Sequence, residues 1–392
     1  MKDRYWVLFS AMALMFLGVT MVFSASGIYA ERELQSSFYF LKKELLWVTL
    51  GSLTLFVAYI FPLKSLQALA PLIFLSVLGL VLLTHTPLGV KVGGAKRWLG
   101  LGFSTLQPSE FMKIALVILL AAYFDWVPKA AGYFWRGVAF PLVLAGLAIL
   151  PVLTQPDLGT AIMMSAVTFL ILFVSGVRLR YLLGLAISGL PILFYCIVQF
   201  PYRLRRIFTF LDPWKDPQGS GFQIVQSFLA IGKGGLSGVG LGESTQKLFY
   251  LPEAHTDFIF SILAEELGFV GSVSVILTFV IFTVAAFRVT LHAADRFTHL
   301  CGVGCCSMIS LQALFNIAVV TGTVPTKGIP LPFISFGGSN MIMNLMVVGI
   351  LLNISKYSEK SKEELKRKKV ISSKTITKPE WRNPVTEKFR IA

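Results

Sequence analysis

Ten long apolar runs constrain this chain more than any other feature of its sequence. Each run is within or near the roughly 17–25 residues that a helix needs to cross a bilayer, and tilt accommodates the longest. Of all residues 55% are hydrophobic and only 14% are charged, whereas soluble domains average about 25% charged residues. We therefore predict an all-α polytopic membrane protein with about ten transmembrane helices and a large extracytoplasmic loop. The predicted spans are residues 6–28, 44–62, 69–86, 108–124, 137–154, 159–177, 181–199, 257–287, 300–323 and 339–355.

The distribution of Lys and Arg in the connections predicts how these spans are oriented. Cytoplasmic connections carry an excess of basic residues, and residues 356–392 hold twelve Lys/Arg against five Asp/Glu. We therefore predict a transmembrane domain at 1–355, a basic cytoplasmic tail at 356–392 and both termini in the cytoplasm. Oppositely charged pairs at i,i+4 in 358–369 predict that the last helix continues into the tail. No groove-reading motif accompanies the charge, so nucleic acid is not an expected partner.

The predicted outer face carries three connections of unusual length, at 87–107, 200–256 and 324–338. Their basic residues oppose the positive-inside rule, which calls for a functional reason. Within the large loop, the half-apolar stretch 223–231 predicts an amphipathic helix in the membrane interface. The glycine-rich run 232–242 that follows leaves two alternatives open: a flexible re-entrant turn, or a cradle whose backbone N–H groups bind phosphate.

The first candidate group for chemistry joins a basic stretch to the start of a span. Lys96, Arg97 and Trp98 precede that span. Glu110 and Lys113 lie in its first turns, three residues apart and therefore on one helix face. Charges inside a membrane helix cost about 2.5–3.5 kcal/mol on insertion scales, which makes them functional candidates. Two alternatives stay open: the charged wall of a cavity, or an ion pair that only neutralises itself.

The second candidate group lies where the large loop enters a long span. Asp257 stands at the helix mouth, Glu253 and His255 precede it, and Glu265 and Glu266 follow inside the helix. A single carboxylate there would be explained as a helix cap. A group of this size instead favours a positioned general base that acts on a hydroxyl nucleophile. A divalent cation held by Glu253, His255 and Asp257 is a further alternative, and its spacing is not diagnostic.

The third candidate group is the connection 324–338, here called the proline loop. It contains three prolines and three glycines, together with Lys327 and Ser335. Irregular backbone at membrane depth is tolerated only where it is buried in protein or lines a wet cavity. Because the other two groups lie on the same predicted face, the three together predict a polar cavity at the outer pole.

These motifs together resemble the SEDS family of bacterial cell-wall polymerases, named for shape, elongation, division and sporulation. They occur in family order over most of the chain, and the stretches 252–257 and 325–333 are more similar to the cell-division branch than to the elongation branch. The residues that carry the resemblance are Gly94–Trp98, Gln107–Glu110, Gly219–Ser227, Leu251–Phe260 and Lys327–Ser339.

The resemblance implies a glycosyltransferase that polymerises lipid II into glycan strands at the outer face of the cytoplasmic membrane, for septal wall synthesis. The family's essential aspartate falls on Asp257, the expected general base, and its cavity-lining pair falls on Glu110 and Lys113. No cofactor is implied beyond the divalent cation left open above. The residues expected to contact substrate are Lys96, Arg97, Trp98, Glu110, Lys113, Arg203, His255, Lys327 and Ser335.

The resemblance also implies partners and a location. The expected partners are lipid II, a class B penicillin-binding protein with transpeptidase activity, and other divisome membrane proteins. The expected location is the bacterial cytoplasmic membrane at the division septum. Two other functions stay open: a lipid II flippase, and a non-catalytic division scaffold. A flippase needs a polar path between the leaflets, and the inner halves of the spans are strongly apolar, which favours the enzyme.

Overall fold

A computed structural model describes residues 2–376, except 93–94, 101, 103, 249–250 and 253. Side chains are described over the same residues, except 92, 192–193, 196, 201–203 and 365–376. Within this part of the chain each predicted span coincides with a helix, so the helical membrane class is confirmed. Among the described residues, six helices are long and apolar enough to cross a membrane, judged by length and composition alone. Outside these six, α5 (Pro108–Trp126) carries charges, and the apolar helical stretches that are fully described at Ala70–Leu83, Leu158–Val174 and Leu179–Pro191 are shorter.

The helices that form the bundle run in chain order from α1 to α13. Besides α5 they are α1 (Asp3–Leu34), α2 (Tyr39–Ile60), α3 (Leu63–Ala68), α4 (Ala70–Leu83), α6 (Phe140–Thr154), α7 (Leu158–Val174), α8 (Leu179–Val198), α9 (Pro201–Leu211), α10 (Phe222–Gly234), α11 (Ile259–Leu291), α12 (Arg296–Val320) and α13 (Gly338–Ile376). Short 3₁₀ turns at Ala130–Gly132 and Pro213–Lys215 and a π-helical turn at Trp135–Ala139 complete the helical structure of the described residues.

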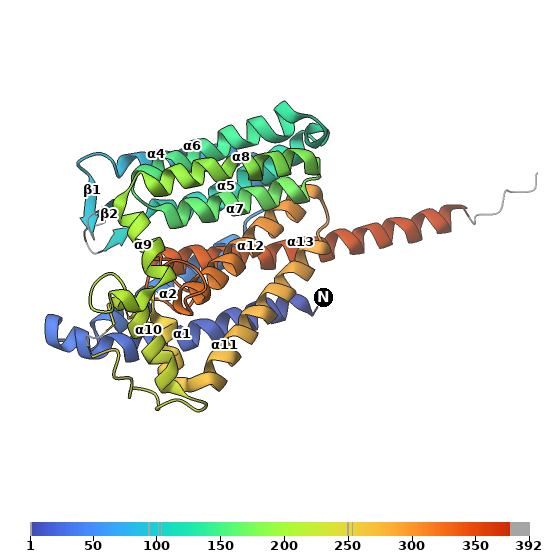
Figure 1. The fold of residues 1–392 in the computed structure, drawn as a ribbon. Coiled ribbons are helices and arrows are strands. Elements are labelled where there is room, and N and C mark those ends of the chain that lie inside the picture. The colour runs from blue at the N-terminus through green and yellow to red at the C-terminus, as the bar shows by residue number, and fades with distance from the viewer. Residues whose placement is uncertain are drawn as a thin grey trace, which may run out of the picture.

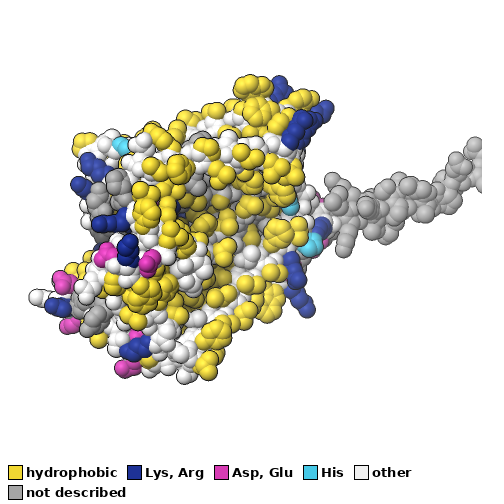
Figure 2. Space-filling model, in the orientation of Figure 1, with side chains coloured by type: hydrophobic (Ala, Val, Ile, Leu, Met, Phe, Trp, Pro, Cys, Tyr) yellow, Lys and Arg dark blue, Asp and Glu magenta, His cyan; other side chains and the backbone are white. Residues whose placement is uncertain are grey.

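The helices pack around α5, α12 and α13. Helix α12 contacts α5, α7, α11 and α13, while α2 lies along α13 and α1 lies along α11. Figure 1 shows α9, α10 and the strands at one end of the bundle, here called the loop end. The N-terminus and the projecting part of α13 lie at the opposite end, here called the tail end. On the face seen in Figure 2, hydrophobic side chains cover the middle and charged side chains gather at the two ends, as expected for a membrane-spanning body.

The connection 87–107 is not a plain loop, which corrects the all-helical prediction locally. It forms a small antiparallel sheet of β1 (Gly89–Val92), β2 (Ala95–Gly100) and β3 (Thr105–Leu106), in the order β1-β2-β3. Its register shifts between Val90 and Lys91. The strands are only two to six residues long, so periodicity gives them no signal.

The predicted large loop 200–256 also contains regular structure. The helix expected at 223–231 is confirmed as α10, but this helix packs on the bundle. Ser227 Oγ lies 2.8 Å from Ser261 Oγ of α11 and donates to Val320 O of α12 at 2.7 Å. Ile224, Val225 and Ala230 are buried. One side of α10 therefore packs against protein, and its position at the membrane interface stays a prediction.

The glycine-rich run that follows α10 packs against a break in α11. Gly268 interrupts that helix with φ 67° and ψ −164°. The backbone groups released there find partners in the run: Val239 N donates to Glu265 O at 3.0 Å, and Phe269 N donates to Gly235 O at 2.9 Å. Gly240 N likewise donates to Glu266 O at 3.1 Å. These N–H groups are engaged inside the protein, so the structure does not favour the phosphate cradle.

The last described residues of the chain continue the final helix, as the charge pattern predicts. Helix α13 runs without interruption from Gly338 to Ile376, across the predicted boundary at 355. Glu359 on this extension accepts from Arg4 Nη1 at 2.6 Å, and Lys356 Nζ lies 4.5 Å from the centre of the Tyr59 ring. The predicted continuation of the last helix over 358–369 is confirmed.

Candidate active site

Asp257 lies at the loop end, in the turn that leads into α11. The helix begins at Ile259 and Phe258 takes the N-cap position, so Asp257 precedes the cap by one residue. Its side chain is half-buried. Helix position alone therefore does not account for Asp257, and the contacts around it are informative.

The backbone around Asp257 is fastened to the proline loop and to α12 by three consecutive carbonyl groups. The carbonyl oxygen of His255 accepts from Phe336 N at 2.9 Å. That of Thr256 accepts from Ser335 Oγ at 2.7 Å, and that of Asp257 accepts from Asn316 Nδ2 at 2.8 Å. Buried backbone oxygens need such partners. The segment is thereby held in one position relative to the proline loop.

The proline loop also passes directly over the Asp257 carboxyl group. A Cβ atom at Gly328 would lie 2.5 Å from Asp257 Oδ2, closer than real Cβ contacts come. Only a glycine leaves room for the carboxylate in its present position. Lys327 is the preceding residue, so the structure brings the predicted base and this predicted basic residue into the same neighbourhood.

Ser335 has a different place from the one predicted. It is 1% exposed, and its hydroxyl both donates to Thr256 O and accepts from Leu331 N at 2.7 Å. A hydroxyl engaged on both sides and closed off from solvent does not face a substrate. We therefore correct the prediction of direct substrate contact, because the hydrogen bonds of Ser335 hold the proline loop to the Asp257 segment.

His255 is packed among aromatic rings. The centroid of Phe40 lies 4.8 Å from that of the imidazole, Phe336 lies at 5.9 Å, and Tyr29 stacks at 6.0 Å. These rings come from α1, α2 and the proline loop, so the cluster ties three elements together beside Asp257. The ring is half-buried, which leaves part of it accessible.

Glu110 and Lys113 form an ion pair inside the bundle. Lys113 Nζ lies 3.0 Å from Glu110 Oε2, and only 5% of each side chain is exposed. Pro108 at the start of α5 suits the first turn of a helix, where a missing N–H costs nothing. The predicted pairing on one helix face is confirmed, and its burial is deeper than an interfacial pair would have.

A polar network extends from this ion pair to the proline loop. Lys113 Nζ donates to Gln312 Oε1 at 3.0 Å, and Gln312 Nε2 donates to Pro330 O and to Asn340 Oδ1, both at 2.9 Å. Asn344 Nδ2 donates to the same Asn340 oxygen at 3.1 Å. The proline loop therefore contacts both predicted groups: the Asp257 segment directly, and Glu110 and Lys113 through Gln312.

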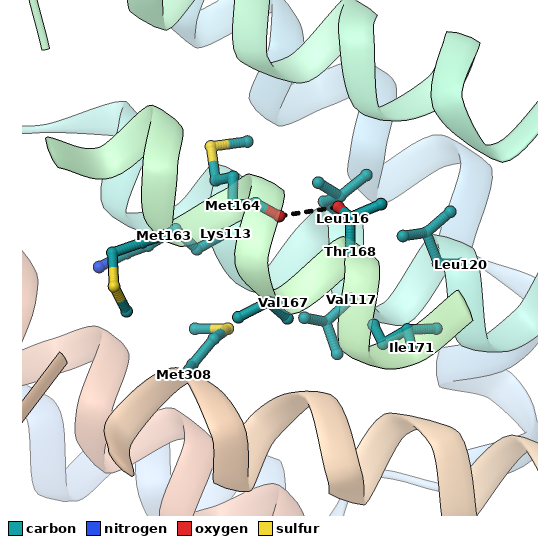
Figure 3. A pocket seen from close by; sticks show the side chains of 10 residues that line it. All are labelled: Lys113, Leu116, Val117, Leu120, Met163, Met164, Val167, Thr168, Ile171 and Met308. Carbon is teal, nitrogen blue, oxygen red and sulfur yellow. Dashed lines mark hydrogen bonds between the residues drawn. The ribbon is translucent and has the colours of Figure 1, made fainter. Parts of the chain in front are cut away.

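The space beside Lys113 is small and mostly apolar. A cavity of about 10 Å³ lies between α5, α7 and α12, and its lining includes Leu116, Val167 and Met308 (Figure 3). Thr168 also lines it, but the Thr168 hydroxyl donates to Met164 O at 2.7 Å. This volume suits about one water molecule. A sugar substrate cannot enter here, so Lys113 would have to be approached from the loop end.

The predicted basic residues lie in different surroundings. Lys96 is exposed and Trp98 half-buried on β2. Arg97 donates to Gln155 O at 2.8 Å and to Pro156 O at 2.9 Å, which joins the sheet to the turn between α6 and α7. Arg203 lies in α9, and its side chain is outside the described residues. Nearby on α9, Arg206 Nη1 donates to Thr326 O of the proline loop at 3.1 Å.

The metal alternative involves Glu253, His255 and Asp257. Among the residues that the structure describes, no three His, Cys, Asp or Glu side chains gather as metal ligands. Glu253, one of the three proposed ligands, lies outside the described residues. Glu265 and Glu266 are used elsewhere: Glu265 accepts from Ser244 Oγ and Thr245 N, and Glu266 pairs with Lys247 Nζ at 2.9 Å.

Gln312 and Asn316 organise this site, although neither was among the predicted residues. They lie one turn apart in α12 and are each 1% exposed. A signal was present, because polar side chains in a membrane helix are expensive and mark functional positions. Their partners are distant in the chain, and no local pattern indicates which carbonyl groups they bind.

Comparison with known proteins places the chain among proteins of one family. The family of cell cycle proteins FtsW, RodA and SpoVE matches residues 4–360. A probable peptidoglycan glycosyltransferase FtsW of Geobacter metallireducens is 43% identical over 350 residues, which covers 89% of this chain and 93% of the relative. Stage V sporulation protein E of Bacillus subtilis is 41% identical over 346 residues, covering 88% of this chain and 94% of the relative.

Solved structures agree in fold. A chain of a peptidoglycan synthase complex aligns with a TM-score of 0.75 at 30% identity, covering 90% of this chain and 98% of the other. The rod shape determining protein RodA of Thermus thermophilus aligns with a TM-score of 0.67 at 27% identity, covering 89% and 95%. With a family match over 4–360 and relatives above 40% identity along most of their length, the chain belongs to the FtsW, RodA and SpoVE family of cell cycle proteins, which is the SEDS family.

Proposed function

We propose that this chain is a peptidoglycan glycosyltransferase that polymerises lipid II during septal wall synthesis. The observation that carries the proposal is the position of the Asp257 carboxylate beneath Gly328. Gly328 belongs to the proline loop, and Gln312 links the same loop to the Glu110–Lys113 pair. The proline loop thus joins a carboxylate that can accept a proton to a buried ion pair on α5, and glycosyl transfer can use both kinds of group. The names of the relatives, which include peptidoglycan glycosyltransferase, support the same activity.

In the proposed reaction a sugar hydroxyl of one substrate attacks the anomeric carbon of the other. The new C–O bond forms as the bond to the undecaprenyl diphosphate breaks, and the electron pair leaves with the diphosphate. Asp257 accepts the proton of the attacking hydroxyl. Positive charge for the diphosphate comes from the basic residues of the site, which are Lys96, Arg97, Lys113, Arg203 and Lys327. The residues that contact the rest of the substrate are Trp98, Glu110 and His255. Any of these cations that faces the leaving group stabilises charge that develops in the transition state.

The test of this function is polymerisation of lipid II by the purified chain, with and without its cognate transpeptidase. Glycan strands produced by the chain support the enzyme. A flippase would move lipid II between leaflets and make no strands, and a scaffold would do neither. We propose a class B penicillin-binding protein as the partner, since a structural neighbour comes from a peptidoglycan synthase complex.

We further propose that the loop end faces outward, at the division septum, with both termini in the cytoplasm. A thiol introduced by Ser220→Cys, at an exposed position before α10, should react with a membrane-impermeant maleimide added to spheroplasts. One introduced by Lys362→Cys, exposed on the extension of α13, should react only after lysis. The unsubstituted chain gives the background of its native cysteines. The reverse labelling pattern would put the candidate site on the wrong side for an exported substrate.

Gly328→Ala tests whether the position of the Asp257 carboxylate matters. The new methyl group would overlap Asp257 Oδ2, the end of a side chain that can rotate away, so we expect little loss of thermal stability. Polymerisation should nevertheless fall at least about tenfold, because misplacing a reacting group by about 1 Å can cost about 10²-fold. Thermal melting in detergent and the rate of lipid II polymerisation measure the two effects.

The matched control for this change is Gly302→Ala in α12. A Cβ atom there would overlap Thr290 Cγ2 at 2.6 Å, a clash of similar size at a position distant from the proline loop in the chain. The control should keep its activity per folded molecule. Equal activity of Gly328→Ala and wild type would show that the tight passage over Asp257 has no catalytic purpose.

A further inference from the structure

Asn316 joins the two segments that meet at the candidate base. Its amide nitrogen donates to Asp257 O at 2.8 Å and to Ile329 O of the proline loop at 2.7 Å. The side chain is 1% exposed, so water does not replace either bond. One carboxamide therefore fixes the separation between the backbone of Asp257 and the loop that crosses over its carboxylate.

The neighbouring turn of α12 repeats this arrangement. Gln312 lies four residues before Asn316 and binds the next carbonyl of the loop, that of Pro330. The two side chains hold successive loop residues from a single rigid helix. Gly328 adjoins Ile329 and leaves no room for a Cβ atom against the Asp257 carboxylate, so a shift of Ile329 would be passed on to that carboxylate.

We propose that Asn316 is a positioning residue for glycosyl transfer, which acts by setting the place of Asp257 under the proline loop. The inference rests on the proposed function, since it assumes that Asp257 is the base. Asn316 itself acts through the backbone and needs no contact with substrate. Its loss should lower the rate of the chemical step and leave substrate binding nearly unchanged.

The chain offers a matched control in Asn353 of α13. Its amide nitrogen also donates to two backbone carbonyl groups, those of Ala58 at 2.9 Å and Phe61 at 2.6 Å. It is 8% exposed. Its partners lie at the C-terminal end of α2, whereas the proline loop meets the N-terminal end of that helix. Replacing each asparagine by leucine removes the same two donors at similar volume, so the two variants differ chiefly in location.

The experiment compares Asn316→Leu and Asn353→Leu in the full-length purified chain with its transpeptidase. Both should lose comparable thermal stability. Only Asn316→Leu should lower kcat for lipid II polymerisation, by about 10–100-fold, with KM within about twofold of wild type. If Asn316→Leu does not insert, Asn316→Ser, which keeps one donor, is compared with Asn353→Ser, and a smaller fall in kcat is expected.

Two results would overturn the inference. One is a kcat for the Asn316 variant equal to that of its Asn353 counterpart, and the other is a raised KM at unchanged kcat. Asp257→Asn is assayed alongside to separate this outcome from failure of the proposed function. An inactive Asp257→Asn with a normal Asn316 variant removes the inference alone. An active Asp257→Asn removes the proposed base, and the positioning role with it.

Discussion

Replacing Asp257 by Asn should lower lipid II polymerisation by about 10²–10⁴-fold, the usual contribution of a positioned general base. The carboxamide has nearly the size of the carboxylate, so it fits the space beneath Gly328. The backbone bonds of the segment to Asn316, Ser335 and Phe336 do not involve the side chain and should persist. The variant should therefore insert, fold and bind its transpeptidase normally. Strand formation from lipid II by the purified protein measures the loss.

A matched control for this change is Asp295→Asn. Asp295 is a true cap of α12, with Thr298 N donating to Asp295 Oδ1 at 2.8 Å. Asparagine caps helices about as well as aspartate, so this variant should keep both stability and activity. If Asp257 served only its helix, the two variants would behave alike. Normal polymerisation by Asp257→Asn would remove it as the base and remove most of the proposed mechanism.

The helical frame could be predicted because its signal is local. Length and hydropathy locate each span, and the ends agree with the structure to within a few residues in most cases. The break of α11 at Gly268 could not be seen in the same way. The apolar run continues beyond Gly268. Hydropathy gives the length of an apolar run but does not show where its backbone bends. The sheet at 89–106 was missed for a different reason: its strands are too short to show a period.

In the candidate site, too, local features could be predicted from the sequence and contacts between distant residues could not. The Glu110–Lys113 pair follows from spacing on one helix, and the structure confirms it. The backbone contacts that hold the Asp257 segment join residues that are 59 to 81 positions apart, from Asn316 with Asp257 to Phe336 with His255. Only the folded chain brings them together. Ser335 illustrates the limit, since its motif marks it as important while its two internal bonds show how it acts.

The Glu110–Lys113 pair should respond unequally to the loss of each partner. Removing one member of a buried ion pair costs about 3–5 kcal/mol, because it leaves an uncompensated charge. Lys113→Met leaves both the Glu110 carboxylate and Gln312 Oε1 without their cation. Glu110→Gln leaves Lys113 bound to Gln312 and keeps an amide oxygen near it. We therefore expect a larger fall in melting temperature for Lys113→Met than for Glu110→Gln.

The double variant separates folding from chemistry. With both changes no buried charge is left unpaired, so most of the stability should return. Polymerisation should stay low in all three variants if the pair faces the substrate. A second buried pair provides the control, since Lys247 Nζ lies 2.9 Å from Glu266 Oε1 with 3% and 0% of the side chains exposed. Lys247→Met should also lower the melting temperature, yet its folded fraction should remain active. Full activity of folded Glu110→Gln and Lys113→Met would show that the pair only neutralises itself within the bundle. The positive charge for the diphosphate would then have to come from the other basic residues proposed for the site.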